Sequence, residues 1–472
     1  MSLMDVARGA YVRSPAAVRR SLAPLLSLVP TKLKYGRAYN LWRKRIALSA
    51  ADTQFAHAQH LKGLRDLLTK AHGSSPFYRE IIEGVFGPGF DPTAIELDGF
   101  RRLPVLRKAD LVKAGDAALA VPKKLVDDAD TSGSNGERPF AFYLDKDRSP
   151  KEFAFVNHVW CQTGYREGDA RAVLRGFGLQ ALDGRLYEWE PALRELRLSV
   201  FPLTLADAVL YLNMIDQHKV RYLYGYPSSI DVLCRHLLKL KRRPKLAFKA
   251  ILPISEPLHA HQRQTIAAAF GDVAIGNFYG LSERAIFAGE LPDQPGIYEF
   301  EPLYGLAELV DEDDQTITEI GKEGRLIGSG FLSTGMPFIR YDTQDRARLV
   351  RLPTRENGQR MRIEGITPRR KPDYLISVDG NRVVTIDFTP DNPRFFIGID
   401  EYQFFQEEPG RCTIKYIASP GGTLKDAERV RADLQQRAQD KLVFSLQKVD
   451  SLISGASGKR AFVDQRLDLT RY

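Results

Sequence analysis

The earliest regular pattern in the chain is a run of apolar residues at helical spacing over residues 55–71. Apolar side chains that recur every three or four residues share one face of a helix, which can then pack against a core. Gly73 stands just after the run, where a C-cap glycine is typical. The pattern therefore predicts a helix over 55–71 that ends near Gly73. The positions that define it are Leu61, Leu64, Leu67, Leu68 and Ala71.

Through residues 150–290, short apolar runs alternate with helical stretches. The aromatic, β-prone segment 140–144 predicts a strand. Further strands are expected near 172–174, 222–224 and 251–252, and helices over 229–240 and 259–270. This alternation favours a layered α/β core.

From residue 296 onward the pattern changes to short strands separated by turn signals, as at 305–310 and 324–328. A charged, proline-containing segment follows at 367–373. Beyond it we expect a hairpin over 374–384, because the pair Asp379-Gly380 favours a two-residue turn.

The last part of the chain predicts a small α+β domain. Strands are expected at 402–405, 412–417 and 445–449, with a helix over 424–441. We therefore predict an α/β protein in three parts: a basic N-terminal segment at 1–50, a large domain of layered sheets and helices at 51–368, and a small C-terminal domain at 369–472.

The net positive charge of the chain lies at its N-terminal end. Of 472 residues, 68 are Lys or Arg and 59 are Asp or Glu, which gives a net charge of +9. Ten basic residues and one acid, Asp5, lie in the first 50 positions, so the rest of the chain is neutral. A neutral body argues against a nucleic-acid partner, and it confines electrostatic docking, such as peripheral contact with an anionic membrane, to the N-terminal segment.

The cysteines and the hydropathy pattern indicate a cytoplasmic protein. Cys161, Cys234 and Cys412 are too far apart for a disulfide framework or a C-x-x-C metal site, which favours a reducing compartment. No window approaches 18 consecutive apolar residues, so we expect neither a transmembrane span nor a signal peptide.

Four short segments carry residues suited to nucleotide chemistry. The loop Thr131-Ser-Gly-Ser-Asn-Gly136 can wrap phosphates, because glycine permits close backbone approach and hydroxyls donate hydrogen bonds. Carboxylates end Asn277-Phe-Tyr-Gly-Leu-Ser-Glu283 and Tyr341-Asp-Thr-Gln-Asp345, and a lysine ends Ser457-Gly-Lys459. Taken singly, these segments have simpler interpretations: a solvated connector, a surface acid, a turn-stabilising acid and a solvated lysine.

In this order and over these distances, the segments resemble the adenylate-forming superfamily of acyl-CoA synthetases. More narrowly, they resemble its phenylacetate-CoA ligase branch and the CapK-type relatives. The resemblance covers nearly the whole chain. It also rests on Ser75-Pro-Phe-Tyr-Arg79, Leu103-Pro-Val-Leu-Arg-Lys108, Tyr224-Gly-Tyr-Pro-Ser-Ser229, Ile254-Ser-Glu-Pro-Leu258, Met336-Pro-Phe-Ile-Arg-Tyr341 and Arg370 with Asp373. Tyr35-Gly-Arg-Ala-Tyr39 resembles the start of CapK-like relatives and is therefore expected to fold onto the body.

The resemblance implies an acid-CoA ligase. Such an enzyme uses ATP and Mg²⁺ to convert a carboxylic acid to acyl-AMP with release of pyrophosphate, and then transfers the acyl group to coenzyme A. The resemblance further implies that 51–368 is the adenylating domain, which binds ATP and the acid, and that 369–472 is a mobile lid that rotates between the half-reactions.

The same resemblance implies roles for individual residues. The loop formed by Thr131, Ser132, Gly133, Ser134, Asn135 and Gly136 would hold the β- and γ-phosphates. Glu283 would bind Mg²⁺, and Asp345 and Arg370 would contact the ribose. Lys459 would bring positive charge to the reacting oxygens, so Lys459 and Glu283 are the catalytic candidates. The remaining nucleotide contacts would be Ser255, Glu256, Pro257, Tyr279, Gly280 and Ser282.

Three departures from the family pattern concern the same segments. The phosphate loop continues for one residue more than usual before Pro139, with Asn135 where threonine is common. Phe140 replaces a frequent lysine, so Arg138 becomes the candidate for neutralising pyrophosphate. Gln344 replaces the glycine of a Thr-Gly-Asp motif, which affects the local turn. No departure removes a catalytic candidate, so we expect an active enzyme.

The identity of the acid and that of the acyl acceptor stay open at this point. Aryl or arylacetic acids are the best-known substrates of the branch, and an apolar pocket for them could be lined by Phe177, Tyr187, Trp189, Phe201, Tyr224 and Tyr226. A second hypothesis transfers the acyl group to an amine or hydroxyl on an amino acid, sugar or carrier. A third, of another class, is a non-catalytic nucleotide-binding or interaction protein that docks through the basic segment.

Overall fold

The computed structural model describes nine stretches of the chain and divides it into two compact units. The described residues are 29, 34–130, 141–175, 185–200, 203–367, 374–385, 398–419, 421–452 and 463–472. Unit 1 consists of Met1–Ala129, Ala141–Asp169 and Ala274–Arg369. Unit 2 consists of Asp130–Phe140, Ala170–Val273 and Arg370–Tyr472.

Unit 1 begins with helices that carry one buried face each. Its helices are α4 (Gly36–Ala51), α5 (Thr53–Ser74), α6 (Pro76–Phe86), α7 (Leu97–Phe100), α8 (Lys108–Ala114) and α9 (Arg148–Cys161), with 3₁₀ turns η1 (Pro92–Ala94), η2 (Gly115–Ala118) and η3 (Lys123–Leu125). Helix α5 confirms the predicted helix, since Leu64, Leu67, Leu68 and Ala71 are fully buried.

The predicted end of α5 at Gly73 is wrong. Gly73 lies inside the helix, and Ser75 ends it in an extended conformation. The reason is Pro76, whose ring disfavours helical geometry in the residue before it. Ser75 then caps the next helix, because its side chain accepts a hydrogen bond from the backbone N–H of Tyr78.

The described part of the basic N-terminal segment is folded into unit 1. Tyr39 of α4 is fully buried, and its hydroxyl donates to Oε1 of Glu167 at 2.5 Å. The side-chain amide of Asn157 on α9 donates to the same hydroxyl at 2.9 Å, and Arg43 pairs with Glu167 at 2.9 Å. These contacts confirm the expectation that residues 35–39 fold onto the body, within unit 1.

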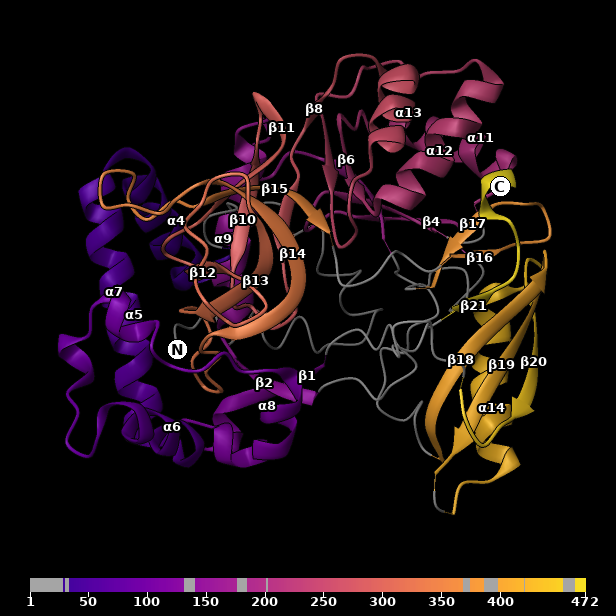
Figure 1. Ribbon diagram of the computed structural model, residues 1–472. Helices are drawn as coiled ribbons and strands as arrows, with labels where there is room; N and C mark the ends of the chain where they lie inside the picture. The colour runs from indigo at the N-terminus through magenta and orange to yellow at the C-terminus, as the bar shows by residue number, and fades with distance from the viewer. Residues whose placement is uncertain are drawn as a thin grey trace. The chain divides into compact units, whose positions relative to one another are not determined.

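A curled antiparallel sheet forms the other half of unit 1. Its strands are β9 (Phe278–Gly280), β10 (Phe287–Leu291), β11 (Gln294–Phe300), β12 (Gly305–Val310), β13 (Glu323–Gly330), β14 (Tyr341–Arg351) and β15 (Arg362–Thr367). They lie in the order β12-β13-β14-β15-β11-β10-β9, and Figure 1 shows β13 and β14 strongly curved. Strands β1 (Val126–Asp130) and β2 (Ala141–Asp145) pair separately.

Glycines allow the segment between β9 and β10 to lie against β12 and β13. A Cβ atom at Gly305 would stand 2.2 Å from the carbonyl oxygen of Ala285 and 2.5 Å from that of Ser329. Its cross-strand partner Gly330 would place a Cβ 2.9 Å from the carbonyl oxygen of Arg284. Since these neighbours are backbone atoms, no side chain fits without moving the chain that carries the candidate site.

Unit 2 contains a mainly parallel sheet covered by helices on one face. Its strands are β3 (Arg171–Leu174), β4 (Tyr187–Glu190), β5 (Glu195–Leu198), β6 (Tyr222–Gly225) and β7 (Ala250–Pro253), in the order β4-β5-β3-β6-β7. The short strand β8 (Ala274–Ile275) falls within the bounds of unit 1. Strands β5, β3, β6 and β7 are parallel. This confirms the predicted strands and the layered α/β character.

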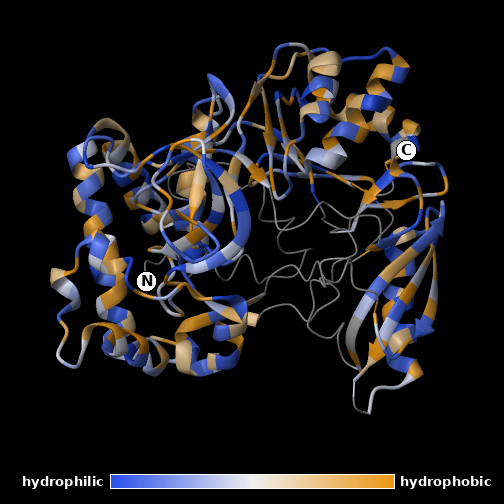
Figure 2. Ribbon diagram, viewed as in Figure 1, coloured by the Kyte–Doolittle hydropathy of each residue, from blue (hydrophilic) through white to orange (hydrophobic). Residues whose placement is uncertain are grey.

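Helices α11 (Leu205–Gln217), α12 (Pro227–Leu240) and α13 (Ala260–Phe270) share a hydrophobic core with one face of this sheet. Ala172, Leu174, Leu223 and Ile251 belong to that core, whereas the alternate residues of the strands point away from it. In Figure 2 the three helices show mixed hydrophobic and hydrophilic colours, as expected for helices with one buried face.

The C-terminal part of unit 2 agrees with the predicted elements. Strands β18 (Ile399–Glu408), β19 (Arg411–Ala418), β20 (Val443–Lys448) and β21 (Val463–Gln465) form a sheet in the order β20-β19-β18-β21, with α14 (Leu424–Ala438) and η6 (Leu469–Arg471). Strands β16 (Tyr374–Ile376) and β17 (Arg382–Val384) form the hairpin expected around Asp379-Gly380. Among the described residues, no helix combines the length and the apolar character needed to span a membrane.

We predict that Gly305→Ala destabilises the protein by about 1–3 kcal/mol, because the new methyl group overlaps two backbone oxygens. The matched control is Gly84→Ala on α6, an exposed helical position with no atom within 4 Å of the new Cβ. The control should stabilise by about 0.5–1 kcal/mol through helix propensity. Urea unfolding measures both, and equal stabilities of the two variants would contradict the close packing at Gly305.

Candidate functional site

Two residues that are far apart in the sequence meet at the edge of the curled sheet. The hydroxyl of Tyr279 on β9 donates to Oδ2 of Asp345 on β14 at 2.6 Å. Three strands separate β9 from β14 in the sheet order, so the curl of the sheet brings them together. Burial raises the pKa of Tyr279 well above its ordinary value, and the Asp345 charge adds to this effect. Tyr279 is therefore a fixed neutral donor to Asp345.

Glu283 lies in the loop after β9 and joins the same cluster. Its side chain is buried, and Oε1 accepts a hydrogen bond from the hydroxyl of Tyr341 at 2.9 Å. Burial is the largest influence on Glu283 and raises its pKa, as does the charge of Asp345, whereas Tyr341 and Lys108 lower it. The sequence motifs contained Tyr341 but gave no sign that it binds Glu283.

Gln344 adopts the backbone conformation that glycine usually supplies. Its φ is +65°, in the left-handed region. The turn is held by a hydrogen bond from the N–H of Gln344 to Oδ1 of Asp342 at 2.7 Å, and β14 carries an irregularity against β13 here. Gln344 therefore occupies a turn position that glycine favours, and it bears the backbone strain.

The other predicted residues of unit 1 surround this cluster. Gly280 ends β9 and pairs with Phe287 of β10, and Ser282 is exposed beside Glu283. The structure thus brings Tyr279, Glu283 and Asp345 together, with Gly280 and Ser282 on the connecting chain.

In unit 2, Ser255, Glu256 and Pro257 follow the carboxyl end of β7. Both carboxylate oxygens of Glu256 are held at 3.0 Å by Ser228, one by its backbone N–H and one by its hydroxyl. Burial raises the pKa of Glu256 to about 7, although these hydrogen bonds oppose the shift. Ser255 has a φ of +66°. Ser228 stood within a motif, but its bond to Glu256 was not predicted.

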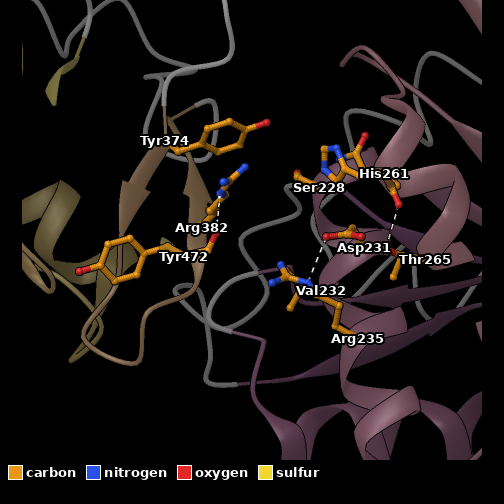
Figure 3. Close-up of a pocket in the computed structure, with 10 residues that line it drawn as sticks. Ser228, Asp231, Val232, Arg235, His261, Thr265, Tyr374, Arg382 and Tyr472 are labelled. Atoms are coloured by element: carbon orange, nitrogen blue, oxygen red, sulfur yellow. Dashed lines mark hydrogen bonds and ion pairs between the residues drawn. The ribbon is translucent and has the colours of Figure 1, made fainter. Parts of the chain in front are cut away.

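Unit 2 also contains a cavity of about 270 Å³ (Figure 3). Helices α12 and α13 contribute one group of lining residues, and the β16–β17 hairpin and Tyr472 contribute the other. Asp231 is buried there. Its Oδ2 pairs with Arg235 at 3.1 Å, and its Oδ1 has no hydrogen-bond partner among the described residues. Polar and ionisable side chains dominate the lining, so the cavity does not suit an apolar ring.

The four described aromatic residues that were expected to line an aryl pocket do not all share one face of the sheet. Trp189 is in register with Leu196, packs against the helix-covered core and stacks on His218 at 4.4 Å. Tyr187 is exposed on the same edge strand, whereas Tyr224 points to the opposite face of the sheet. Phe177 and Phe201 lie outside the described residues. Of the four that the structure describes, Tyr224 and Tyr226 lie at the carboxyl edge of the parallel strands.

Several predicted residues lie outside the part of the chain that the structure describes. They are the phosphate loop Thr131, Ser132, Gly133, Ser134, Asn135 and Gly136, its neighbours Arg138 and Phe140, and Arg370 and Lys459. Their roles stay predictions.

No family model matches the chain. The chain is 25% identical over 362 residues to the phenylacetate-coenzyme A ligase of Aromatoleum evansii, a match that covers 68% of this chain and 78% of that protein. A crystal structure of 2-hydroxyisobutyryl-CoA ligase with 2-HIB-AMP and CoA, in the thioesterification state, aligns with a TM-score of 0.53 at 19% identity, over 87% of this chain and 90% of that chain.

A second structure of that ligase, in the postadenylation state with 2-HIB-AMP, aligns with a TM-score of 0.50 at 19% identity, over 86% of this chain and 88% of that chain. The chain has the adenylate-forming acyl-CoA ligase fold, and it resembles the phenylacetate-CoA ligase branch. The fold class predicted from the sequence is confirmed at the level of an α/β ligase fold.

The donor set around Glu283 suits the magnesium ion that such ligases imply. Among the described residues, no group of three or more His, Cys, Asp or Glu side chains could hold a metal by itself. Mg²⁺ that serves a nucleotide is typically bound by one or two carboxylates together with phosphate oxygens and water. A single buried carboxylate beside Asp345 fits that pattern, so Glu283 would hold the ion and the substrate would supply the other ligands.

We predict that Tyr341→Phe raises the pKa of Glu283 further, because it removes a hydrogen bond that stabilises the carboxylate. Carbon-13 NMR titration of the glutamate side chains measures this, with the signal assigned through Glu283→Gln. The control is Tyr304→Phe, a buried tyrosine whose hydroxyl has no partner among the described residues. An unchanged Glu283 pKa in Tyr341→Phe would contradict the contact.

We predict that Gln344→Gly stabilises the protein by about 1 kcal/mol, because glycine adopts a positive φ without the Cβ conflict. Gln344→Ala keeps that conflict and should show no gain. Thermal or urea unfolding compares the two variants. A Gln344→Gly protein no more stable than Gln344→Ala would show that the left-handed turn is not strained.

Proposed function

We propose that this chain is an ATP-dependent acid-CoA ligase. It activates a carboxylic acid to acyl-AMP with release of pyrophosphate and then transfers the acyl group to coenzyme A. The observation that carries the proposal is the cluster of Tyr279, Glu283 and Asp345. Tyr279 donates to Asp345 at 2.6 Å, and Glu283, which feels the charge of Asp345, accepts from Tyr341 at 2.9 Å. The named relatives, both acid-CoA ligases, support the same reaction class.

Each described residue has a part to which its chemistry is suited. Asp345 accepts hydrogen bonds from the ribose hydroxyls, since a carboxylate can bind several donors while Tyr279 occupies one position. The ring of Tyr279, held by Asp345, lies with Gly280 against the adenine. Ser255, Glu256 and Pro257 of unit 2 keep their predicted role as nucleotide contacts, and Ser228 fixes Glu256.

The first half-reaction moves charge onto the leaving pyrophosphate. A carboxylate oxygen of the acid attacks the α-phosphorus of ATP, a new P–O bond forms, and the bond to the bridging oxygen of pyrophosphate breaks. Residues 131–136 and Arg138 bind the β- and γ-phosphates, and Lys459 neutralises the bridging and carboxylate oxygens. Glu283 would hold Mg²⁺, and the ion would supply further charge neutralisation at the phosphates.

In the second half-reaction the thiol sulfur of coenzyme A attacks the acyl carbon and AMP leaves. We propose that 51–368 forms the adenylating domain and that 369–472 is a lid that changes position between the two steps through the segment around Arg370. The crystallised relative carries CoA in its thioesterification state, which favours coenzyme A over an amine or hydroxyl as the acceptor. A cytoplasmic location is consistent with these substrates.

Lys459→Ala tests the proposal. We expect acid-dependent pyrophosphate release to fall at least about 100-fold, because a charge that stabilises the transition state is lost. The control is Lys448→Ala, an exposed lysine of β20 in the same C-terminal part, which should keep full activity. Unchanged pyrophosphate release in Lys459→Ala would remove this lysine from the reaction.

Two further results would decide which molecule accepts the acyl group and whether the protein is a carboxylate-activating enzyme. Formation of acyl-AMP that coenzyme A never consumes would exclude coenzyme A as acceptor. Absence of pyrophosphate release with every aryl, fatty and amino acid would exclude a carboxylate-activating enzyme.

A further inference from the structure

Arg175 stands at the edge of the parallel sheet where ligands bind in folds of this kind. It directly follows β3, the strand between β5 and β6. Because β5, β3, β6 and β7 are parallel, their carboxyl ends lie along one edge of the sheet. Ligands of open α/β sheets typically bind outside this edge.

Arg175 contacts a tyrosine, and no carboxylate among the described residues forms an ion pair with it. Its Nη1 donates to the hydroxyl of Tyr224 at 2.9 Å, and its guanidinium carbon lies 5.8 Å from the centre of the same ring. Among the described residues, Arg175 forms no ion pair. On the same face of the sheet, by contrast, Arg171 pairs with Glu195 at 2.6 Å.

A partly buried guanidinium without an anionic partner is costly, and it has further N–H donors suited to a carboxylate or phosphate. Burial acts to lower the pKa of Arg175, but the neighbouring Tyr224, Tyr226 and Glu195 raise it, and the net shift is upward. The group therefore stays charged, and a bound anion would satisfy it.

The position of Arg175 along the edge matches the acyl end of an adenylate. In register, Leu174 pairs with Gly225 and Gly225 with Pro253, so Arg175 lies two strands away from Ser255. Neighbouring strands are about 4.8 Å apart, which places these two backbone positions about 10 Å apart. A ligand whose adenine lies at the end of β7 can extend its acyl group over β6 toward β3.

The reacting carboxylate is a poor partner for Arg175. Its charge disappears when acyl-AMP forms, which would leave the guanidinium unpaired through the second half-reaction. An arginine bound to both oxygens of that carboxylate would also stabilise the ground state more than the transition state. A second anionic group, remote from the reacting carboxyl, keeps its charge through both steps.

We propose that Arg175, held by Tyr224, is a specificity residue that binds a second anionic group on the acid, so that the substrates are carboxylic acids with two negative charges. This inference rests on the proposed ligase function. It names the substrate class for the same site: an aryl or alkyl acid with a second carboxylate, in place of the wholly apolar acids that an aromatic pocket would select.

Matched acid pairs test the proposal through acid-dependent pyrophosphate release. The pairs are phenylacetate with 4-carboxyphenylacetate, and hexanoate with adipate. The unmodified protein should favour the dianionic member of at least one pair by about 10-fold or more in kcat/KM. Arg175→Gln should lower kcat/KM for that acid by about 10–100-fold, mainly through KM, and leave the monoanionic partner within about twofold.

Two other variants separate binding from folding. Arg175→Lys keeps the charge but loses the planar fork, so it should fall between the unmodified protein and Arg175→Gln for the dianionic acid. The control is Arg221→Gln at the amino edge of β6, where the arginine donates to the carbonyl oxygen of Ala247. This control should leave the preference for the dianionic acid unchanged.

The outcomes are distinguishable from failure of the ligase function. Equal losses for both acids of each pair in Arg175→Gln would assign the residue to the nucleotide or to folding and overturn the proposal. A preference for the monoanionic acids in the unmodified protein would overturn it as well. If no acid releases pyrophosphate at all, the ligase function itself fails.

Discussion

The candidate site of unit 1 depends on contacts between backbone segments that are too close to leave room for a side chain. Gly305 and Gly330 pair across β12 and β13, and the loop between β9 and β10 lies directly on them. That loop carries Glu283, so the close approach of the loop to the sheet fixes the position of the Glu283 carboxylate. The same curl returns Tyr279 to Asp345 across three intervening strands. The geometry of the acidic cluster thus follows from close packing of main chain.

Some buried charged groups are paired with an opposite charge, whereas others contact only a neutral hydroxyl. Arg340 is buried but pairs with Glu308 at 3.2 Å and donates to backbone carbonyls, so its charge is compensated and its role is structural. Glu283 has a tyrosine hydroxyl in place of a cation and a raised pKa, an arrangement that a bound cation would relieve. Arg175 has a tyrosine in place of an anion. Both of these incompletely compensated groups are assigned to ligands, and ligand sites are where natural proteins tolerate such costs.

Local pattern predicted most of the described elements because each depends on neighbours in the sequence. The helix at 53–74, the strands at 222–225 and 305–310 and the hairpin around Gly380 follow from apolar period, β-propensity and turn chemistry. The end of α5 was misplaced because Pro76 acts on the residue before it more strongly than Gly73 favours a cap. Within the described residues, Trp189 and Tyr224 cannot line one pocket, because residues at alternate positions of β-strands face opposite sides and these two belong to different faces of the sheet.

The sequence by itself located the net charge in the first 50 residues, and its collinear motifs carried the resemblance from which the reaction class was predicted. Only the tertiary structure decided which of those residues meet and what holds them. Tyr341 binds Glu283 across 58 positions, Ser228 fixes Glu256, and Tyr224 holds Arg175 at the end of β3. Such partners depend on sheet order and strand register, which arise from long-range packing and leave no signal in local spacing.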